Sequence, residues 1–220
     1  MKVDFHVHSE ASPDSLMRIP ALIRATRKAG LDRVVITDHN SISGALEAQQ
    51  LAPELIIVGE EVRTTAGELL AAFVTQPVPA GLNPMEALKR LRDQAAFISI
   101  SHPFDPYRSG WNLEQLEQLA PLVDAIEIVN ARALAMNYNT RAIEFARAHG
   151  LAGTVGSDAH QPGEIGKAAL SLPDFNDAES LKDSILQGEY VGGLSPAWVH
   201  LGSTWAKVVK KLGPHEIELH

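Results

Sequence analysis

Residues 3–8 read VDFHVH, a short segment with apolar side chains at every second position and two histidines at its end. Side chains two apart in an extended strand point the same way, so His6 and His8 are expected to lie together. Asp4 shares that face and is expected to accept a hydrogen bond from an imidazole. A His-x-His pair alone is a weak indication of a metal site. This indication becomes stronger if other predicted strands also end in residues that can bind a metal ion.

Apolar segments of strand length recur along the chain, and helix-type segments lie between most of them. Strand–helix alternation over 220 residues predicts a mostly parallel sheet or a barrel in one α/β domain. We expect this domain to span residues 1–212, followed by a loose tail over 213–220. The predicted strands are 3–5, 33–37, 55–58, 68–74, 96–101, 125–129 and 153–157.

Capping residues mark the ends of several predicted helices. Glycine suits the left-handed position after a helix, and an asparagine or aspartate with a glutamate a few positions on suits a helix start. The predicted helices are 20–29 before Gly30, one beginning at Asn83-Pro84, 140–149 before Gly150, and one from the capping residues 176–179 to Gly188.

Most of the predicted strands run into a side chain that can bind a metal ion. In a parallel barrel these carboxyl ends open onto one face, where active sites are built. Residues far apart in sequence are therefore expected to converge there. The residues at these ends are His6, His8, Asp38, His39, Glu60, Glu61, His102, Asn130, Asp158 and His160. The remaining histidines follow no strand and are expected to be structural or exposed; they are His149, His200, His215 and His220.

The composition narrows the classes of function. The chain has no cysteine, so nitrogen and oxygen ligands must hold any metal. A net charge of −8 argues against long nucleic acid as a partner, although bound cations would reverse the sign locally and admit a small anionic substrate. The start, MKVDFHVHSEA, has no apolar leader and no stretch suits a membrane span, which predicts a cytoplasmic protein. The oligomeric state is left open.

The motifs in combination resemble the PHP family, named for polymerase and histidinol phosphatase domains. The likeness covers about residues 3–172 and fits stand-alone members of that family. It implies a distorted (β/α)7 TIM-like barrel that holds two or three divalent ions of zinc, manganese or iron. The matching pieces are DFHVHSEASPD (4–14), ITDHN (36–40), GEE (59–61), SHP (101–103), EIVNAR (127–132) and GSDAH (156–160).

The resemblance also implies a ligand for each ion. His102, Asp158 and His160 are expected to take part in catalysis as well as in metal binding. The implied ligands are His6, His8, Glu61 and Asp158 for the first ion, Glu61 and His102 for the second, and Asp14, His39 and His160 for the third.

Other polar residues near the strand ends are candidates for substrate binding. Asn130 stands where some family members have a histidine or cysteine, so it either supplies the second ion weakly or contacts the substrate. Arg132 and Arg63 could clamp a phosphate or be solvated ion-pair partners. Arg108 is a weaker candidate, and Glu68 is assigned to a tight turn. Aromatic residues near the expected rim that could stack on a base are Tyr107, Trp111 and Tyr138, although Trp111 could equally pack against the following helix.

The expected reaction is hydrolysis of a phosphomonoester or phosphodiester by a metal-bound hydroxide. The substrate would be a small nucleotide, a short oligonucleotide or a sugar or amino-alcohol phosphate. Amidohydrolase-type cleavage of a C–N bond is an alternative, although His102 stands where many such enzymes have a bridging lysine. A non-catalytic metal-binding module and a nuclease acting on long nucleic acid are further alternatives.

Overall fold

The computed structural model describes residues 1–108, 110–195 and 199–212, so the predicted tail over 213–220 lies outside the described residues. The described strands form one sheet in the order β7-β6-β5-β4-β3-β2-β1-β8-β9. They are β1 (Lys2–Val7), β2 (Arg33–Ile36), β3 (Ile56–Arg63), β4 (Glu68–Ala72), β5 (Phe97–Ile100), β6 (Ala125–Asn130), β7 (Ala152–Gly156), β8 (Ala168–Ser171) and β9 (Glu189–Gly192).

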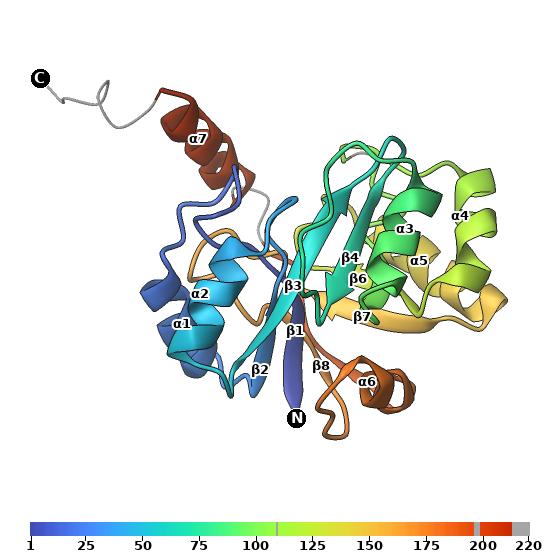
Figure 1. Cartoon of the computed structure of the whole chain (residues 1–220), viewed down its shortest axis with the longest axis horizontal. Coiled ribbons are helices and arrows are strands. Elements are labelled where there is room, and N and C mark those ends of the chain that lie inside the picture. Colours follow the sequence, from blue (N-terminus) through green and yellow to red (C-terminus); the bar gives the residue numbers. More distant parts are fainter. Residues whose placement is uncertain (109, 196–198, 213–220) are drawn as a thin grey trace, which may run out of the picture.

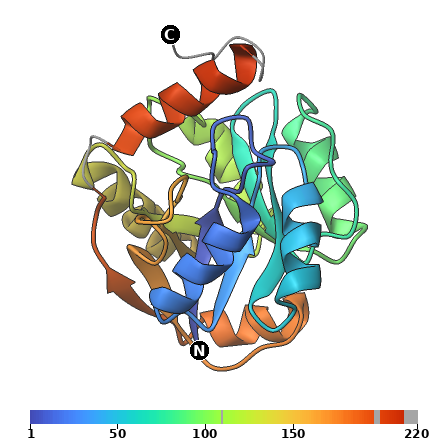
Figure 2. The ribbon, with the colours of Figure 1, turned by 90° about the vertical axis from the view of Figure 1, so that its left-hand side faces the viewer.

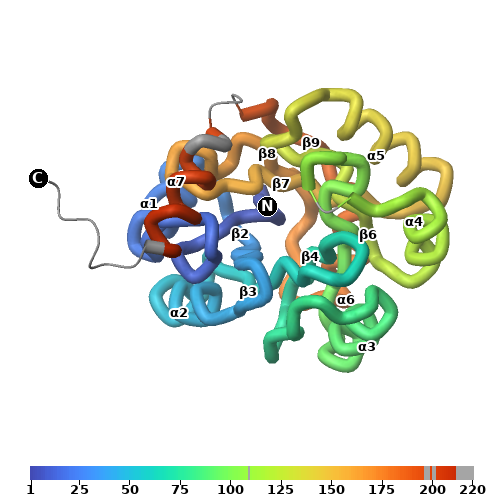
Figure 3. Tube along the Cα trace, turned by 90° about the horizontal axis from the view of Figure 1, so that it is seen from above, coloured from blue at the N-terminus to red at the C-terminus, as the bar shows by residue number. Residues whose placement is uncertain are grey.

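Helices surround the sheet on its outer side. Figure 1 shows α1 and α2 on one side, α3, α4 and α5 on the other, α6 near the N-terminus and α7 at the opposite end. Seen from above, the strands curl into a ring inside these helices (Figure 3). The helices are α1 (Ile19–Lys28), α2 (Ser43–Leu51), α3 (Pro84–Arg92), α4 (Leu113–Leu119), α5 (Met136–His149), α6 (Ala178–Ile185) and α7 (Val199–Leu212), with a 3-10 turn over Ala120–Leu122.

The ring closes between β1 and the segment that follows β7. The Asp158 amide donates to the His6 carbonyl at 2.7 Å, and the His8 amide donates to the Ala159 carbonyl at 2.9 Å. Gly156 makes this approach possible, because a Cβ there would lie 2.3 Å from the Cβ of His6. The seven strands β1–β7 thus form the predicted distorted barrel, and β8 and β9, which were not predicted, extend the sheet from β1.

The predicted barrel is present, but its sheet mixes parallel and antiparallel pairings. β1, β2 and β3 pair parallel, as do β5, β6 and β7. β4 runs antiparallel to both β3 and β5, because the turn over residues 64–67 is too short for a crossover connection. The start of β4 therefore lies beside the carboxyl end of β3, at the same end of the barrel as the predicted ligands.

The predicted element ends are partly confirmed. Gly30 and Gly150 take φ values of 66° and 63° after α1 and α5, as expected for helix C-termini. The Asn83 side chain accepts from the Met85 amide at 2.9 Å and caps α3. The cap of α6 is Asp177, which forms a reciprocal capping box with Ser180, one residue later than predicted. The predicted helix 140–149 begins earlier, at Met136, and α7 was not predicted.

Two apolar clusters hold the barrel together. The larger cluster lies between the strands and the outer helices and includes Leu22, Ile36 and Leu91. The second includes Phe5, Phe97 and Leu181 of α6, towards the end of the barrel where α6 lies. The helices within the described residues are too short or too polar to cross a membrane.

The substitution Gly156→Ala is expected to destabilise the fold, because its new Cβ would force β1 and β7 apart. Overpacking of this kind costs about 1–3 kcal/mol. Each kcal/mol lowers the Tm by about 2–4 °C for a domain of this size. Thermal unfolding of the metal-free protein, followed by circular dichroism, measures the effect. Gly163→Ala is the control, because a Cβ there would meet no atom of the described residues within 4 Å. Equal Tm values for the two variants would contradict this account of the closure.

Candidate metal centre

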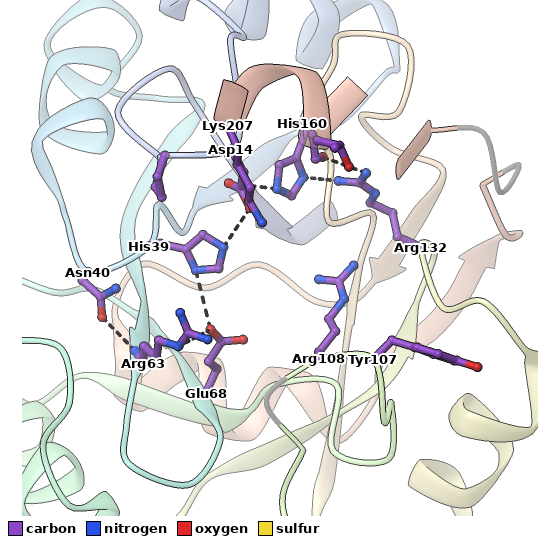
Figure 4. Close-up of a pocket in the computed structure, with 13 residues that line it drawn as sticks. Asp14, His39, Asn40, Arg63, Glu68, Tyr107, Arg108, Arg132, His160 and Lys207 are labelled. Atoms are coloured by element: carbon purple, nitrogen blue, oxygen red, sulfur yellow. Dashed lines mark hydrogen bonds and ion pairs between the residues drawn. The ribbon is translucent and has the colours of Figure 1, made fainter. Parts of the chain in front are cut away.

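The predicted metal ligands converge at one end of the barrel. They come from β1, β3 and the segments that follow β1, β2, β5 and β7. They lie at and below a cavity of about 380 Å³, whose wall includes Asp14, His39 and His160 (Figure 4). The figure shows these side chains pointing toward one another although they are far apart in the sequence.

His6, His8 and Asp158 form the first group that could hold an ion. The Nε2 atoms of His6 and His8 are 3.0 Å apart, and His8 Nε2 lies 3.3 Å from Asp158 Oδ1. The Glu61 Oε2 atom lies 3.3 Å from His6 Nε2. Glu127 Oε1 lies 2.9 Å from His6 Nδ1 and can accept its proton, which leaves Nε2 available for a cation. Three potential ligand atoms thus lie together, and Glu61 Oε2 lies beside the two histidines.

Glu61, Glu68 and His102 form the second group. His102 Nε2 lies 3.0 Å from Glu61 Oε1 and 3.3 Å from Glu68 Oε2. The assignment of Glu68 to a turn is therefore wrong: it begins β4, and the antiparallel pairing carries its carboxylate into the site. Glu127 Oε2 accepts from the His102 amide at 2.8 Å and fixes this loop.

His8, Asp14, His39 and His160 form the third group. Asp14 Oδ2 lies 3.3 Å from His39 Nε2, and Asp14 Oδ1 lies 3.2 Å from His160 Nε2. His39 Nδ1 also lies 3.1 Å from Glu61 Oε2. Because His8 belongs to two groups and Glu61 contacts histidines of all three, the groups form one continuous cluster.

The carboxylates of the cluster shift the proton affinities of its histidines. Burial opposes charge on His6, but Glu61 and Asp158 nevertheless hold the pKa of His6 well above its usual value. Against the same effect of burial, Glu61 and its neighbouring carboxylates raise the pKa of His39 and of His102 to about 9. Burial and the nearby His160 lower the pKa of His8 to about 4. Without a metal ion, protons on histidines therefore balance the buried carboxylates, and divalent cations could replace them.

An unpaired atom and an unusual backbone conformation also suit metal ions. Among the described residues, the buried Asp158 Oδ1, which lies 3.3 Å from His8 Nε2, has no hydrogen-bond partner. His102 and Asp158 adopt φ values of 22° and 54°, which are unfavourable for residues other than glycine. Strain of this kind is concentrated at functional sites. The nitrogen and oxygen donors, with no sulfur, fit the ions expected from the sequence.

The two predicted arginine clamps differ in their surroundings. The Arg63 side chain is 63% exposed on the cavity wall, with its Nε 4.0 Å from Glu68 Oε1. Arg132 lines the cavity but is buried; its guanidinium contacts His160 Nδ1, pairs with Glu164 at 3.4 Å and donates to the Val199 carbonyl. Arg108, the weaker candidate, extends into the cavity and pairs with Asp158.

Asn130 lies beside the ligands and contacts them with its amide group. Its Nδ2 donates to Asp158 Oδ2 at 3.1 Å and to Glu127 Oε2 at 3.2 Å. Its Oδ1 accepts from the Arg132 amide at 2.9 Å. Asn130 therefore helps to position Asp158, and its oxygen already accepts one hydrogen bond from the backbone.

Three further carboxylates act in structural hydrogen bonds. Asp38 accepts from the Ser9 amide and hydroxyl, both at 2.6 Å, and so supports the loop after β1. Asp4 accepts from backbone amides, including that of Ser157 at 2.8 Å, so the expected hydrogen bond from an imidazole is not formed. Glu60 accepts from the Val78 amide at 2.9 Å.

The structure also places the remaining candidates. His149 pairs with Glu117 at 2.7 Å on the outer surface, as expected for a structural histidine. The side chain of His200 and all of His215 and His220 lie outside the described residues. Trp111 is buried against Gly67, so its suggested role at the rim is wrong, whereas Tyr107 is exposed on the cavity wall.

Sequence reasoning missed several residues of the site. Glu127 lies inside β6, three residues before the end at which ligands were sought. Ser203, Thr204 and Lys207 line the cavity from α7, which lies far from the motifs in sequence. Strict alternation would place Glu127 on the face opposite Asn130, and the irregularity between Glu127 and Val129 carries no motif. No motif in the sequence points to α7 either.

Comparison with known proteins finds a matching family model and two relatives. The model of the PHP_C family, described as PHP-associated, matches residues 137–190. The chain is 34% identical to the uncharacterised protein MJ0417 of Methanocaldococcus jannaschii over 80% of its own length and 72% of that protein. It is 30% identical to MJ1587 of the same organism over 60% of its own length and 82% of that protein.

Solved structures share the fold at low sequence identity. PsfC from Pseudomonas syringae superposes with a TM-score of 0.70 at 19% identity, covering 94% of this chain and 98% of that one. A candidate metal-dependent phosphoesterase from Bifidobacterium adolescentis gives 0.65 at 17% identity, covering 85% and 96%. An amidohydrolase from Chromobacterium violaceum with bound sulfate and no metal gives 0.63 at 16% identity, covering 78% and 92%. With its motifs gathered at one end of this barrel, the chain belongs to the PHP family.

Proposed function

We propose that this protein is a metal-dependent hydrolase of phosphoesters. The observation that carries the proposal is a continuous cluster of histidines and carboxylates beneath a cavity with arginines on its wall. The substrate would be a phosphomonoester or phosphodiester of a small nucleotide, a short oligonucleotide or a sugar or amino-alcohol phosphate. A small anionic substrate suits the cavity of about 380 Å³ better than long nucleic acid does.

The proposed ligand sets follow the three groups. Zinc, manganese or iron held there would lower the pKa of a coordinated water and neutralise phosphate oxygens. His8 and Glu61 would be shared between neighbouring ions. The sets are His6, His8, Glu61 and Asp158; Glu61, Glu68 and His102; and His8, Asp14, His39 and His160.

Residues around the cluster would bind the substrate and hold the ligands in place. Arg63 and Arg108 would donate to the phosphate oxygens from the cavity wall. Arg108 now pairs with Asp158, and a cation bound by Asp158 would compete for that carboxylate and free the guanidinium for the substrate. Asn130 and Glu127 would keep Asp158 and His6 in orientation. Tyr107 offers an aromatic surface for the leaving group.

The known structures support this proposal in two ways. The Bifidobacterium adolescentis protein of the same fold is a candidate metal-dependent phosphoesterase. The Chromobacterium violaceum protein binds sulfate, a tetrahedral anion like phosphate, although it is named an amidohydrolase. That name keeps C–N bond hydrolysis as the alternative outcome of the test.

Activity of the metal-loaded protein tests the function directly. We expect the chain, purified and saturated with manganese or zinc, to hydrolyse at least one member of a panel of nucleotides, sugar phosphates and short oligonucleotides. Amides and lactones are assayed in parallel. Asp158→Asn is expected to lower kcat by about 10–100-fold, because an amide is a poor substitute for a ligand carboxylate. Hydrolysis of amides or lactones alone would replace this function with the C–N alternative, and no hydrolysis at all would leave a metal-binding module.

The place of Glu68 in the second group is tested by metal content. Glu68→Gln keeps the shape of the side chain but removes its charge, so binding of one ion should weaken about 10–100-fold. Elemental analysis after equilibration with limiting metal should then show about one ion fewer per chain. Glu86→Gln on the surface of α3 is the matched control, because its partner is the exposed Arg90. Unchanged metal content in Glu68→Gln would remove this residue from the ligand set.

A further inference from the structure

The C-terminal helix α7 lies across the mouth of the cavity. Figure 2 shows it running over the loop that follows β1, at the end of the barrel opposite the N-terminus. The side of α7 that faces the cavity contributes Ser203, Thr204 and Lys207 to its wall. The helix therefore contributes one wall of the cavity, although it lies outside the barrel.

Contacts with the site hold α7 in this position. Arg132, which also binds His160, donates to the Val199 carbonyl at 3.0 Å and to Ser203 Oγ at 2.9 Å. Lys210 donates to the Glu10 carbonyl at 2.5 Å and also to that of Ser12, in the loop that carries Asp14. The buried apolar residues described on α7, Val199 and Ala206, belong to neither of the two core clusters. The position of α7 is thus coupled to the ligands.

Lys207 is the residue of α7 that reaches the ligand cluster. Its ammonium lies 3.4 Å from Asp14 Oδ2, although its side chain is 62% exposed. The same carboxylate contacts His39 and His160. Figure 4 shows Lys207 and Arg63 on opposite sides of His39, with Arg108 on a third side. Three cationic side chains from separate elements therefore surround the cluster.

A bound metal ion would change the partner of the Lys207 ammonium from the Asp14 carboxylate to an anion. A cation held by Asp14, His39 and His160 would neutralise the carboxylate and repel the nearby ammonium. An anion placed between the cation and Lys207 would turn this repulsion into attraction on both sides. The ammonium is a compact donor on a flexible stem, which suits contact with an oxygen of a tetrahedral anion.

We propose that Lys207 of α7 is a substrate-binding residue that donates to a non-bridging oxygen of the substrate phosphate. It acts from the side of the cavity opposite Arg63, so the anion is held between α7 and the barrel. This proposal rests on the proposed phosphoesterase function for the identity of the substrate group. The predicted binding of a free phosphate ion does not depend on turnover.

Calorimetric titration of the full-length, manganese-loaded protein with inorganic phosphate tests the proposal. Lys207→Gln should weaken phosphate binding about tenfold, the effect expected for loss of one charge-assisted hydrogen bond. The KM for a hydrolysed phosphoester should rise by a similar factor, with kcat changed less than about twofold. Lys211→Gln removes the same charge from an exposed position one turn later on α7 and should leave both values within about twofold.

The manganese content of each variant is measured as well. It shows whether Lys207 contacts phosphate directly or acts indirectly by supporting metal binding at Asp14. Unchanged phosphate affinity in Lys207→Gln overturns the proposal. Loss of manganese from this variant, with normal phosphate affinity in the chains that keep their metal, also overturns it. Equal weakening by Lys211→Gln would assign the effect to the general charge of α7 and overturn the specific contact. If the wild type binds phosphate but hydrolyses no phosphoester, the proposed function fails while the Lys207 comparison stands. A wild type that binds no phosphate overturns the Lys207 proposal.

Discussion

The site depends on the contact between β1 and the segment after β7. Two backbone hydrogen bonds join His6 and His8 to Asp158 and Ala159, which are about 150 residues away in the chain. They bring the first and the last ligand motifs together, and Gly156 leaves the space for this approach. Every other ligand is placed relative to this seam, because the remaining strands complete the ring between its two sides.

Charge is the second constraint on the site. Glu61 and Asp158 are fully buried, and a buried carboxylate is stable only with a compensating partner. In the structure, neighbouring histidines and Arg108 hold the pKa of these carboxyls well below the usual value and so provide this compensation. In a site of this kind, divalent ions can take the place of protons and of an arginine as partners of the carboxylates. The polar contacts of Asn130 and Glu127 then keep the ligands in the same arrangement.

The sequence predicted the barrel and most of the cluster because both follow from local patterns. Apolar strands that end in histidine or carboxylate place ligands such as His39 and His102 wherever the strand ends meet. Glu68 and Glu127 could not be found in this way, since one begins an antiparallel strand and the other lies inside a strand. Lys207 depends on where a distant helix docks, which no local pattern specifies. The motifs therefore did not predict the direction of a strand or the position at which a distant helix docks.

The hairpin of β3 and β4 carries Glu61 and Glu68 on neighbouring strands. Its register pairs Glu61 with Leu70 and Arg63 with Glu68 across a turn in which Thr64 binds the Gly67 carbonyl. A slip of one residue would turn a whole set of side chains to the opposite face. Single-residue insertions and deletions in this turn should therefore be rare as related sequences diverge. Among the described residues, 103–108 belong to no such ladder, so this segment can change in length and thereby alter the part of the cavity wall that carries Tyr107.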